Sequence, residues 1–511
     1  METIDSYVLF AVIALPMAGA AVLIAVPSVH VRAVKIIAIT FAVVTAATSL
    51  YVFAAYDHEA NGYQFLRTWD WLSLPGAGPL GDVGISLALG ADGISALLVM
   101  LTGVVMLTGV MISWSMTDRV KDFFILYFLL LSGVFGVFVS RDLFFLFFFY
   151  ELAVLPMYLL IAVWGSSSDF GTFVRTKEYG AMKLTLYLVA GSVLVWIAIL
   201  AVFVQAGLGT FSMAELERVA DSAFSTTFQQ VFFPFLMVGF GVLAGLWPFH
   251  TWSPDGHVAA PTAVSMVHAG VLMKLGAYGI IRLGLGLMPE GAADWMPVLA
   301  GLAMVNVLYG ATSAMAQRDL KYVVGYSSIS HMGYVLLGIA TLNTLGMSGA
   351  VLQMFSHGVM TALFFAVVGV IYDRTHTRDI GALEGMAKRM GYTTAFFAVA
   401  GLASLGLPGL SGFVAELLVF LGLFQSRPIL GALAVIGAAI TAVYILRLMA
   451  KVFFGELGVR WRDQTDLSRL EGAASLVLAG FILLMGLFPF PFMRAIDGSV
   501  AAMLARLVGA S

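Results

Sequence analysis

The chain has 511 residues, of which 61% are hydrophobic and only 11% are charged. This balance leaves far too little polar surface to cover a water-soluble globule, so the sequence predicts a protein whose solvent is lipid. Cysteine is absent and the formal net charge is -3. The lack of cysteine excludes disulfides, thiolate-held iron–sulfur clusters and covalently attached haem from the chain. The small net charge gives no reason to expect a nucleic-acid partner.

Apolar runs long enough to cross a membrane recur along the whole sequence. Each has about 18 residues or more, enough for a helix to span roughly 30 Å of hydrocarbon, and the runs are continuous rather than alternating as in a barrel strand. Backbone groups inside a bilayer must pair within the protein, and continuous apolar runs achieve this as helices. We therefore expect an all-α, polytopic membrane helix bundle with about 14 transmembrane helices, near residues 6–26, 33–56, 86–114, 122–140, 142–164, 179–206, 228–252, 260–285, 293–315, 320–341, 346–371, 391–425, 429–454 and 470–492.

The basic residues divide unequally between the two sides that this helix count defines. Most of the 26 Lys and Arg residues fall in the loops of one side, and cytoplasmic loops carry such an excess in membrane proteins. We therefore expect both termini to be on the non-cytoplasmic side. The two sizeable loops of that side are 57–85 and 207–227, and the second contains a candidate amphipathic helix from Met213 to Phe224.

Two of the expected helices are interrupted by proline and glycine. The seventh contains Trp247-Pro248 and then Pro254, and we expect a break at each; the twelfth contains Gly406-Leu407-Pro408-Gly409. Proline removes a helical hydrogen-bond donor, and broken helices at corresponding places in two halves are typical of transporters built from inverted repeats. We therefore expect two inverted five-helix repeats, which divide the chain into residues 1–121 with helices 1–3, 122–285 with helices 4–8, 286–454 with helices 9–13, and 455–511 with helix 14 and a tail.

Five ionisable side chains lie near the middle of expected helices: Glu151, Lys274, His331, His357 and Glu416. Burying each in a membrane costs a few kcal/mol, and a file of carboxylate, amine and imidazole groups suits stepwise proton transfer. Each can instead be a structural tie between helices. The cost of burial favours the functional interpretation for Glu151 and Lys274, whereas both interpretations stay open for the other three.

Lys183 and His250 are weaker candidates for the same pathway. Lys183 lies about 9 Å beyond Lys177 along its helix, close enough to the cytoplasmic end for its amine to reach the surface. His250 and His257 flank Asp255, but their spacing matches no zinc pattern. We expect these three residues to cap and tie the broken seventh helix.

Several segments share the motifs of one family: Arg141-Asp142-Leu143 running on to Glu151 and Leu155-Pro156-Met157-Tyr158, Pro248-Phe249-His250-Thr251-Trp252 with Pro254-Asp255-Gly256-His257, Leu272-Met273-Lys274, and Ser356-His357-Gly358. On these motifs the chain resembles the M-type antiporter-like subunits (NuoM in bacteria) of respiratory complex I, the NADH:quinone oxidoreductase, which correspond to chain 4 of the mitochondrial enzyme. The resemblance places Glu151 at the family's essential glutamate, Lys274 at its central lysine and Glu416 at its exit-side glutamate.

This resemblance implies a proton-translocating membrane-arm subunit, driven by quinone reduction in partner subunits. The chain would be a non-redox part of a translocase in the bacterial cytoplasmic (inner) membrane and hold no cofactor, because FMN, iron–sulfur clusters and quinone belong to partners. Those partners include further antiporter-like chains and other membrane subunits, with membrane lipid around them. The alternatives are a subunit of a multisubunit cation/proton antiporter, a module of a related hydrogenase or inorganic-carbon uptake complex, and a structural spacer with a degenerate channel.

One position departs from the family pattern. The family usually has Lys-x-Pro ahead of its Pro-x-His-x-Trp motif, and the aligned stretch here is Leu243-Ala244-Gly245. The lysine that would pair with Glu151 is thus replaced by Leu243. Either a neighbouring group such as His250 takes its place, or the chain translocates differently or not at all.

Overall fold

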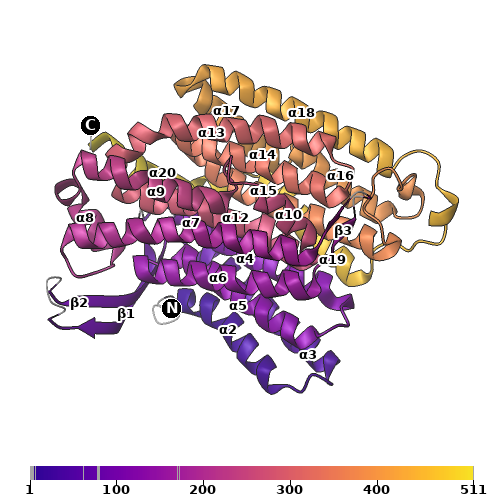
Figure 1. Cartoon of the computed structure of the whole chain (residues 1–511), viewed down its shortest axis with the longest axis horizontal. Coiled ribbons are helices and arrows are strands. Elements are labelled where there is room, and N and C mark those ends of the chain that lie inside the picture. Colours follow the sequence, from indigo (N-terminus) through magenta and orange to yellow (C-terminus); the bar gives the residue numbers. More distant parts are fainter. Residues whose placement is uncertain are drawn as a thin grey trace.

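The long helices of the chain lie roughly along one direction in an elongated bundle (Figure 1). The computed structural model describes residues 5, 7–60, 62–76, 81–169, 171 and 173–509, with side chains described as far as residue 507. Within them, thirteen helices are long and apolar enough to cross a membrane. The expected polytopic helix bundle is confirmed.

Burial divides the helices into an inner and an outer set. The apolar windows of α15 and of the helix from α11 to η4 are fully buried, those of α14 and α4 nearly so, and those of α3 and α18 only one third buried. The helices are α2 (Val8–Ala25), α3 (Val31–Ala55), α4 (Gly93–Ile112), α5 (Val120–Val139), α6 (Leu143–Trp164), α7 (Lys177–Ala206), α8 (Met213–Ala223), α9 (Thr226–Ala244), α10 (Trp252–Ala259), α11 (Thr262–Val267), η3 (His268–Leu272), α12 (Met273–Gly279), η4 (Ile280–Leu285), α13 (Pro289–Ala316), α14 (Leu320–Ala340), α15 (Thr344–Thr375), α16 (Gly391–Ser404), α17 (Ser411–Ser426), α18 (Pro428–Val452), α19 (Arg469–Leu487) and α20 (Phe490–Gly509), with short 3₁₀ turns η2 (Ser113–Ser115), η5 (Met386–Lys388) and η6 (Val459–Trp461).

The two interrupted helices occur where the sequence predicts them. Between α9 and α10 the chain turns at Gly245, and between α16 and α17 it turns at Gly406 and Gly409, all three with positive φ. Glycine adopts this conformation at little cost because it has no Cβ. Thirteen of the expected spans each contain one of the thirteen long helices, α9 standing for the interrupted seventh span, and α16 with α17 forms the remaining, twelfth span.

The expected second break, at Pro254, is wrong. Pro254 is the third residue of α10, and the helix continues through it to Ala259. The first N–H groups of a helix have no partner inside that helix, so a proline in the first turn removes no hydrogen bond.

The helix that carries Lys274 is irregular. Its segments α11 and α12 are separated by the π-helix η3, and α12 runs into a second π-helix, η4. Such wider turns are rare and occur frequently at functional sites. Lys274 is the second residue after the first of them.

Helices α6 and α14 begin in the same way. Asp142 caps α6 and Asp319 caps α14, each by accepting backbone N–H groups. Each aspartate also forms an isolated antiparallel bridge with a residue that follows the next two helices, Asp142 with Ser212 and Asp319 with Asp379. Two inverted repeats would produce this correspondence, and the division of the chain into repeats stays a prediction.

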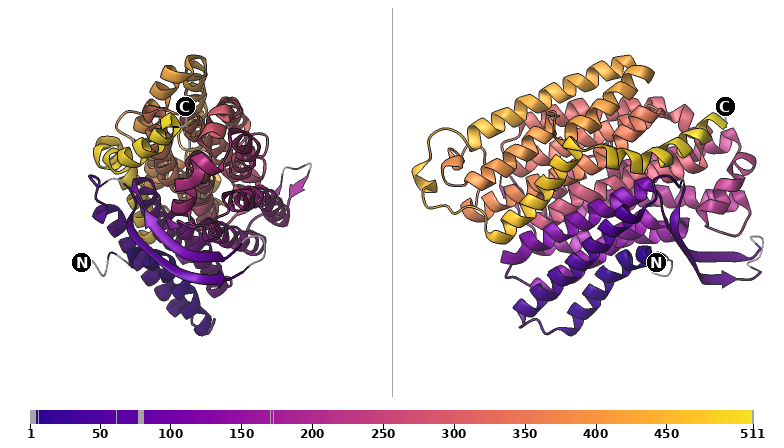
Figure 2. Two further views of the ribbon diagram at one scale, coloured as in Figure 1. Left: turned by 90° about the vertical axis from the view of Figure 1, so that its left-hand side faces the viewer. Right: turned by 180° about the vertical axis from the view of Figure 1, so that it is seen from behind.

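Three elements were not expected from the sequence. The loop 57–85 contributes strand β1 (Gln64–Leu74), which pairs antiparallel with β2 (Val83–Ala91). A second small hairpin joins β3 (Ser168–Asp169) to β4 (Val174–Arg175). The tail after the fourteenth span is the helix α20, and the chain ends toward the same end of the long axis as its beginning (Figures 1 and 2).

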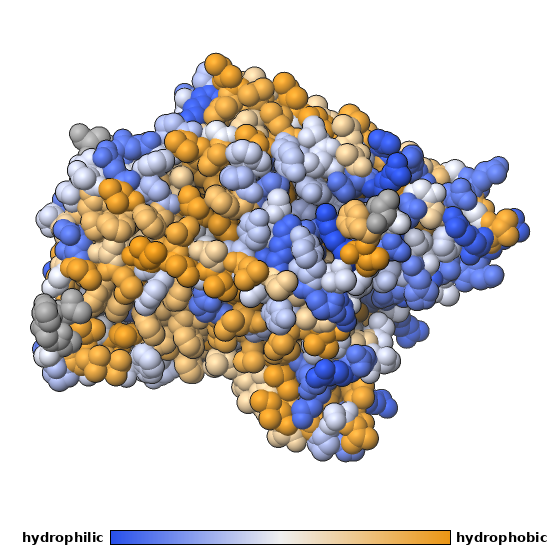
Figure 3. Space-filling view, in the orientation of Figure 1, coloured by the Kyte–Doolittle hydropathy of each residue, from blue (hydrophilic) through white to orange (hydrophobic). Residues whose placement is uncertain are grey.

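The surface follows the arrangement expected of a membrane protein. Apolar side chains cover much of the face drawn in Figure 3, and hydrophilic residues gather at its right-hand end, where the loops around α16 and before α19 lie. The protein is therefore a multi-pass membrane protein.

Candidate functional site

Four of the five central candidates form one buried chain of polar groups. The amine of Lys274 on α12 lies 2.8 Å from Nδ1 of His357 on α15. The rings of His357 and His331, on α14, have centroids 5.4 Å apart, and Nδ1 of His331 lies 3.3 Å from Oε1 of Glu416 on α17. All four are buried, with Glu416 only 3% exposed. We call Lys274, His357, His331 and Glu416 the polar relay.

Two neutral side chains hold the relay in place. Nε2 of Gln353 lies 3.3 Å from Nδ1 of His331 and 3.4 Å from Oε1 of Glu416, and the hydroxyl of Ser404 lies 2.9 Å from Nε2 of His331. Sequence reasoning missed both residues. Gln353 precedes His357 by four residues and so lies on the same face of α15, which is a signal that helical periodicity offers. Ser404 is the last residue before the break in the twelfth span.

Lys274 has an unusual environment for a buried amine. It donates hydrogen bonds to the carbonyl oxygen of Ala269, in the π-helix η3, and faces the imidazole of His357. Its side chain is fully buried and pairs with no carboxylate among the described residues. The imidazole of His357 is thus the group to which the Lys274 amine can pass a proton.

Glu151 is not part of this chain of contacts. Its Oε1 has no hydrogen-bond partner among the described residues, although the Ser192 side chain on α7 lies beside it. Phe148 and Leu155, three residues before and four after it, are 47% and 58% exposed. Glu151 therefore lies near the outer surface of α6, although its Oε1 is buried. Leu243, at the family's usual lysine position, is fully buried.

Lys183, which the sequence allowed to extend alone to the surface, is instead held in an ion pair. Its amine donates to Oδ2 of Asp255 at 2.8 Å, and Oδ1 of the same carboxylate accepts from Arg175 at 2.5 Å and from the hydroxyl of Tyr322 at 3.0 Å. Asp255, on α10, thus ties the short helix to α7 and α14. The expectation that Asp255 fixes the broken helix is correct.

His250 and His257 do not tie the broken helix by hydrogen bonds, although the His250 ring packs against Tyr309 of α13 and the His257 ring against His268. Neither ring nitrogen of either residue has a hydrogen-bond partner among the described residues. The turn is held instead by Asn306 of α13, whose Oδ1 accepts from the backbone N–H of Trp247 at 2.6 Å and whose Nδ2 donates to the Gly245 carbonyl at 2.8 Å. A neutral asparagine in an apolar helix gave no such signal in the sequence.

A helix bundle that crosses the membrane repeatedly, with two broken helices and a buried relay through its centre, has the architecture of an antiporter-like membrane subunit. The chain belongs to the family described as NADH:quinone oxidoreductase/Mrp antiporter, TM, whose sequence pattern matches residues 140–441. The resemblance seen in the motifs is confirmed.

Similar proteins extend over nearly the whole chain. NADH-quinone oxidoreductase subunit M of Rhodobacter capsulatus is 37% identical, with 95% of this chain and 94% of that protein covered. NAD(P)H-quinone oxidoreductase chain 4 of Gloeobacter violaceus is 35% identical, covering 94% of this chain and 89% of its own length.

Solved structures agree with the fold. A chain of respiratory complex I from Thermus thermophilus with bound NADH is 28% identical and superposes with a TM-score of 0.86, covering 98% of this chain and 99% of that one. A chain of the Mrp complex from Dietzia sp. DQ12-45-1b superposes with a TM-score of 0.82 at 20% identity, covering 99% of this chain and 100% of that one. The second likeness shows the fold alone.

Proposed function

We propose that the chain is a membrane-arm subunit of a complex I-type NADH:quinone oxidoreductase and translocates protons through the polar relay. The observation that carries the proposal is the buried file of polar groups from Lys274 to Glu416 in a chain of this family. Its matched relatives at 35% and 37% identity carry quinone oxidoreductase names, which favours this function over the alternative of a cation/proton antiporter subunit.

The geometry supports proton transfer in steps. The Lys274 ammonium hands a proton to Nδ1 of His357 across their 2.8 Å contact. Nε2 of His357 has no partner among the described residues, and a water molecule there bridges to the ring of His331, because imidazole accepts at one nitrogen and releases at the other. His331 then faces Glu416 directly, which receives the proton.

Glu151 lies outside the polar relay, on the outer helix α6. Phe148 and Leu155, its exposed neighbours on α6, form a face on which a second membrane subunit would pack, whereas the unpartnered Oε1 of Glu151 is buried inside this chain. We propose that this face of α6 docks another membrane subunit and that Glu151, which lacks a lysine at position 243, is held within this chain beside the Ser192 side chain of α7. The sequence of events is then proton exchange at Glu151, transfer to Lys274, and passage along the relay.

The driving force comes from elsewhere in the assembly. FMN, iron–sulfur clusters and quinone are assigned to partner subunits, and this chain acts as the non-redox part of the translocase in the bacterial cytoplasmic membrane. Both termini are then outside the cytoplasm.

Co-purification tests the proposed complex. The chain, tagged at its C-terminus and extracted in mild detergent, is expected to bring down subunits that contain flavin and iron–sulfur clusters, together with NADH:quinone activity. Recovery with small membrane subunits alone would assign the chain to a cation/proton antiporter instead.

A further inference from the structure

A cavity of about 590 Å³ opens between α13, α14 and α18, at the end of the bundle that holds most basic loops. Its walls come from the last turn of α13, the start of α14, the segment after α15 and the last two turns of α18. None of the proton-pathway candidates lines it. The cavity is therefore a separate feature of the fold.

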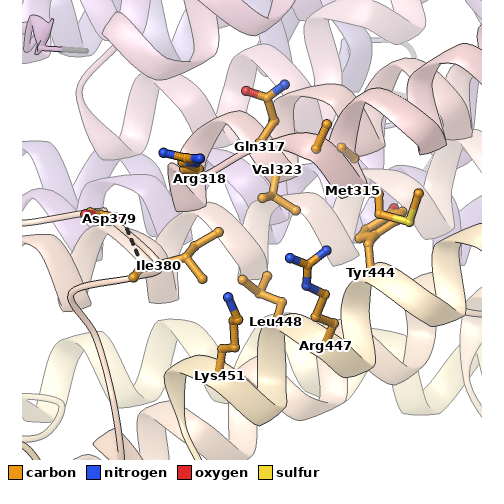
Figure 4. Close-up of a pocket in the computed structure, with 13 residues that line it drawn as sticks. Met315, Gln317, Arg318, Val323, Asp379, Ile380, Tyr444, Arg447, Leu448 and Lys451 are labelled. Carbon is orange, nitrogen blue, oxygen red and sulfur yellow. Dashed lines mark hydrogen bonds between the residues drawn. The ribbon is translucent and has the colours of Figure 1, made fainter. Parts of the chain in front are cut away.

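Three cations line this cavity: Arg318 before α14, and Arg447 and Lys451 one turn apart on α18. Figure 4 shows the charged ends of Arg447 and Lys451 directed from α18 toward the ribbon that carries Arg318. None of the three makes a side-chain hydrogen bond or ion pair with another residue that the structure describes. By contrast, Arg374 and Arg378 at the same end of the bundle are paired with Glu471 and Asp319.

The cavity is cationic as a whole. The carboxylate among its lining residues is Asp379, whose Oδ1 accepts a hydrogen bond from the backbone N–H of Gly381 at 2.9 Å. Three positive charges against one negative charge repel cations and attract anions. This arrangement argues against a passage for protons or sodium ions and favours a bound anion.

The floor of the cavity is apolar. Val323, Ile380 and Leu448 lie between the cations (Figure 4). The cavity also opens beside a lipid-facing surface, because Val443 and Leu446 on α18 are 56% and 54% exposed. A ligand with an anionic group and an apolar body fits these two surroundings better than a free inorganic anion.

We propose that this cavity binds the phosphate headgroup of an anionic phospholipid. Arg447 and Lys451 hold the phosphate from α18, Arg318 holds it from the start of α14, and the glycerol and first acyl carbons lie on Leu448 and Ile380. Basic pockets between transmembrane helices on the cytoplasmic side are suited to such headgroups. The site does not depend on the proposed proton pathway.

Photo-labelling of membranes that contain the full-length chain tests the proposal. The probes are phosphatidylglycerol and phosphatidylcholine with the same photoactivatable group near the headgroup, and the readout is the yield of adducts on peptides covering 314–323 and 444–451. We expect phosphatidylglycerol to label these peptides about tenfold more than phosphatidylcholine, because each Lys or Arg near the surface strengthens attraction to anionic lipid severalfold. Equal labelling by the two lipids would overturn the proposal.

A matched pair of variants locates the site. Arg447→Gln with Lys451→Gln removes two charges from the cavity, and Lys388→Gln with Arg389→Gln removes two exposed charges outside it. The first pair is expected to abolish the preference for phosphatidylglycerol and the second to leave it unchanged. An equal loss of the preference for phosphatidylglycerol in both pairs of variants would indicate a general effect of surface charge and would contradict the proposal. If the first pair does not accumulate in membranes, the comparison of the two lipids in the unaltered chain still decides the question.

Competition distinguishes a lipid from a free anion. Excess unlabelled phosphatidylglycerol is expected to suppress labelling, and inorganic phosphate alone is expected to leave it unchanged. Suppression by inorganic phosphate to the same degree would show that the cavity takes a soluble anion, and the lipid assignment would be wrong.

Discussion

Lys274 and His357 meet across 2.8 Å from two helices whose apolar windows are fully buried. The amine has no carboxylate partner among the described residues, so the imidazole and one backbone carbonyl satisfy it. Lys183, the other lysine proposed from the sequence, is instead paired with Asp255. The two lysines therefore have different roles in the protein.

Lys274→Ala is expected to remove most of the proton transport that this chain contributes, because the relay loses the group that feeds His357. Lys183→Ala is expected to leave transport largely intact and to lower the free energy of unfolding by roughly 1–3 kcal/mol, because Asp255 loses one of its donors. The measurements are the proton-to-electron ratio in reconstituted vesicles and thermal unfolding in detergent. Equal losses of coupled transport in the two variants would show that the relay is not the pathway.

Glu151→Gln is expected to reduce proton translocation while leaving assembly intact. Glutamine has nearly the same shape as glutamate but cannot ionise. Glu151 is also separate from the relay, so combining Glu151→Gln with Lys274→Ala is expected to add little to the loss from Lys274→Ala alone if both lie on one pathway. Additive losses in the proton-to-electron ratio would indicate two independent pathways.

The parts of this fold that depend on local composition could be predicted from the sequence. Spans follow from continuous apolar runs, and the turns at Gly245 and Gly409 follow from the Gly and Pro residues around them. The strand β1 could not be predicted, because its register with β2 is set by pairing between the two segments. The break predicted at Pro254 does not occur, because a proline in the first turn of a helix removes no hydrogen bond. The sequence does not show that α10 begins only two residues earlier.

The candidate site could be predicted only as a set of residues. Lys274, His331, His357 and Glu416 were identified by their charge in apolar helices, and their order in space comes from the packing of four helices. Gln353, Ser404 and Asn306 were not predicted because a neutral polar residue costs little in a membrane helix, and only Gln353, one turn before His357, has a position that indicates a role. Glu151 joined the list by the same reasoning but lies outside the relay.

Asp142→Asn is expected to stabilise the protein at about pH 8 and to have little effect near pH 4. Burial raises the pKa of the Asp142 carboxyl to about 6. The folded protein therefore binds this proton more tightly than the unfolded chain, and the contribution to stability is complete below the unfolded pKa and is lost as the pH rises through 6. The substituted asparagine carries no charge to desolvate, so the gain at alkaline pH is at most about 3 kcal/mol.

Thermal unfolding in detergent, measured across that pH range, checks this prediction. Asp142→Ala is the matched control, because it removes the charge and also the oxygen that accepts from the Phe145 backbone N–H. Asp142→Ala is expected to gain less stability at alkaline pH than Asp142→Asn, since losing a helix cap costs about 1 kcal/mol. A wild-type pH profile parallel to that of Asp142→Asn would refute the raised pKa.

A reporter fused to the C-terminus is expected to be active only on the non-cytoplasmic side. The expectation rests on the distribution of Lys and Arg among the loops and on the two ends of the chain lying toward the same end of the bundle (Figures 1 and 2). A fusion after Lys388, at the opposite end, is expected to report the cytoplasm. Cytoplasmic activity of the C-terminal fusion would reverse the orientation.

Leu243→Lys restores the residue that the family usually carries opposite the glutamate. Helices α6 and α9 are close at this level, because the ring of Phe240, one turn before Leu243, lies 6.4 Å from that of Tyr150, the neighbour of Glu151. A buried ammonium without a partner costs several kcal/mol, and an adjacent carboxylate offsets much of this cost. The protein is therefore expected to tolerate Leu243→Lys when Glu151 is present. In the Glu151→Gln background, the same substitution is expected to lower the free energy of unfolding by roughly 3 kcal/mol or more.

A double-mutant cycle on thermal stability measures this coupling, with Leu243→Met as the control for volume. A coupling well above zero, together with increased proton transport in Leu243→Lys, would mean that α6 and α9 can still hold the usual lysine–glutamate pair and that its loss at Leu243 lowers proton transport. Equal destabilisation in both backgrounds would mean that the lysine cannot reach Glu151. The carboxylate would then depend on the Ser192 side chain of α7, which lies beside it, and not on α9.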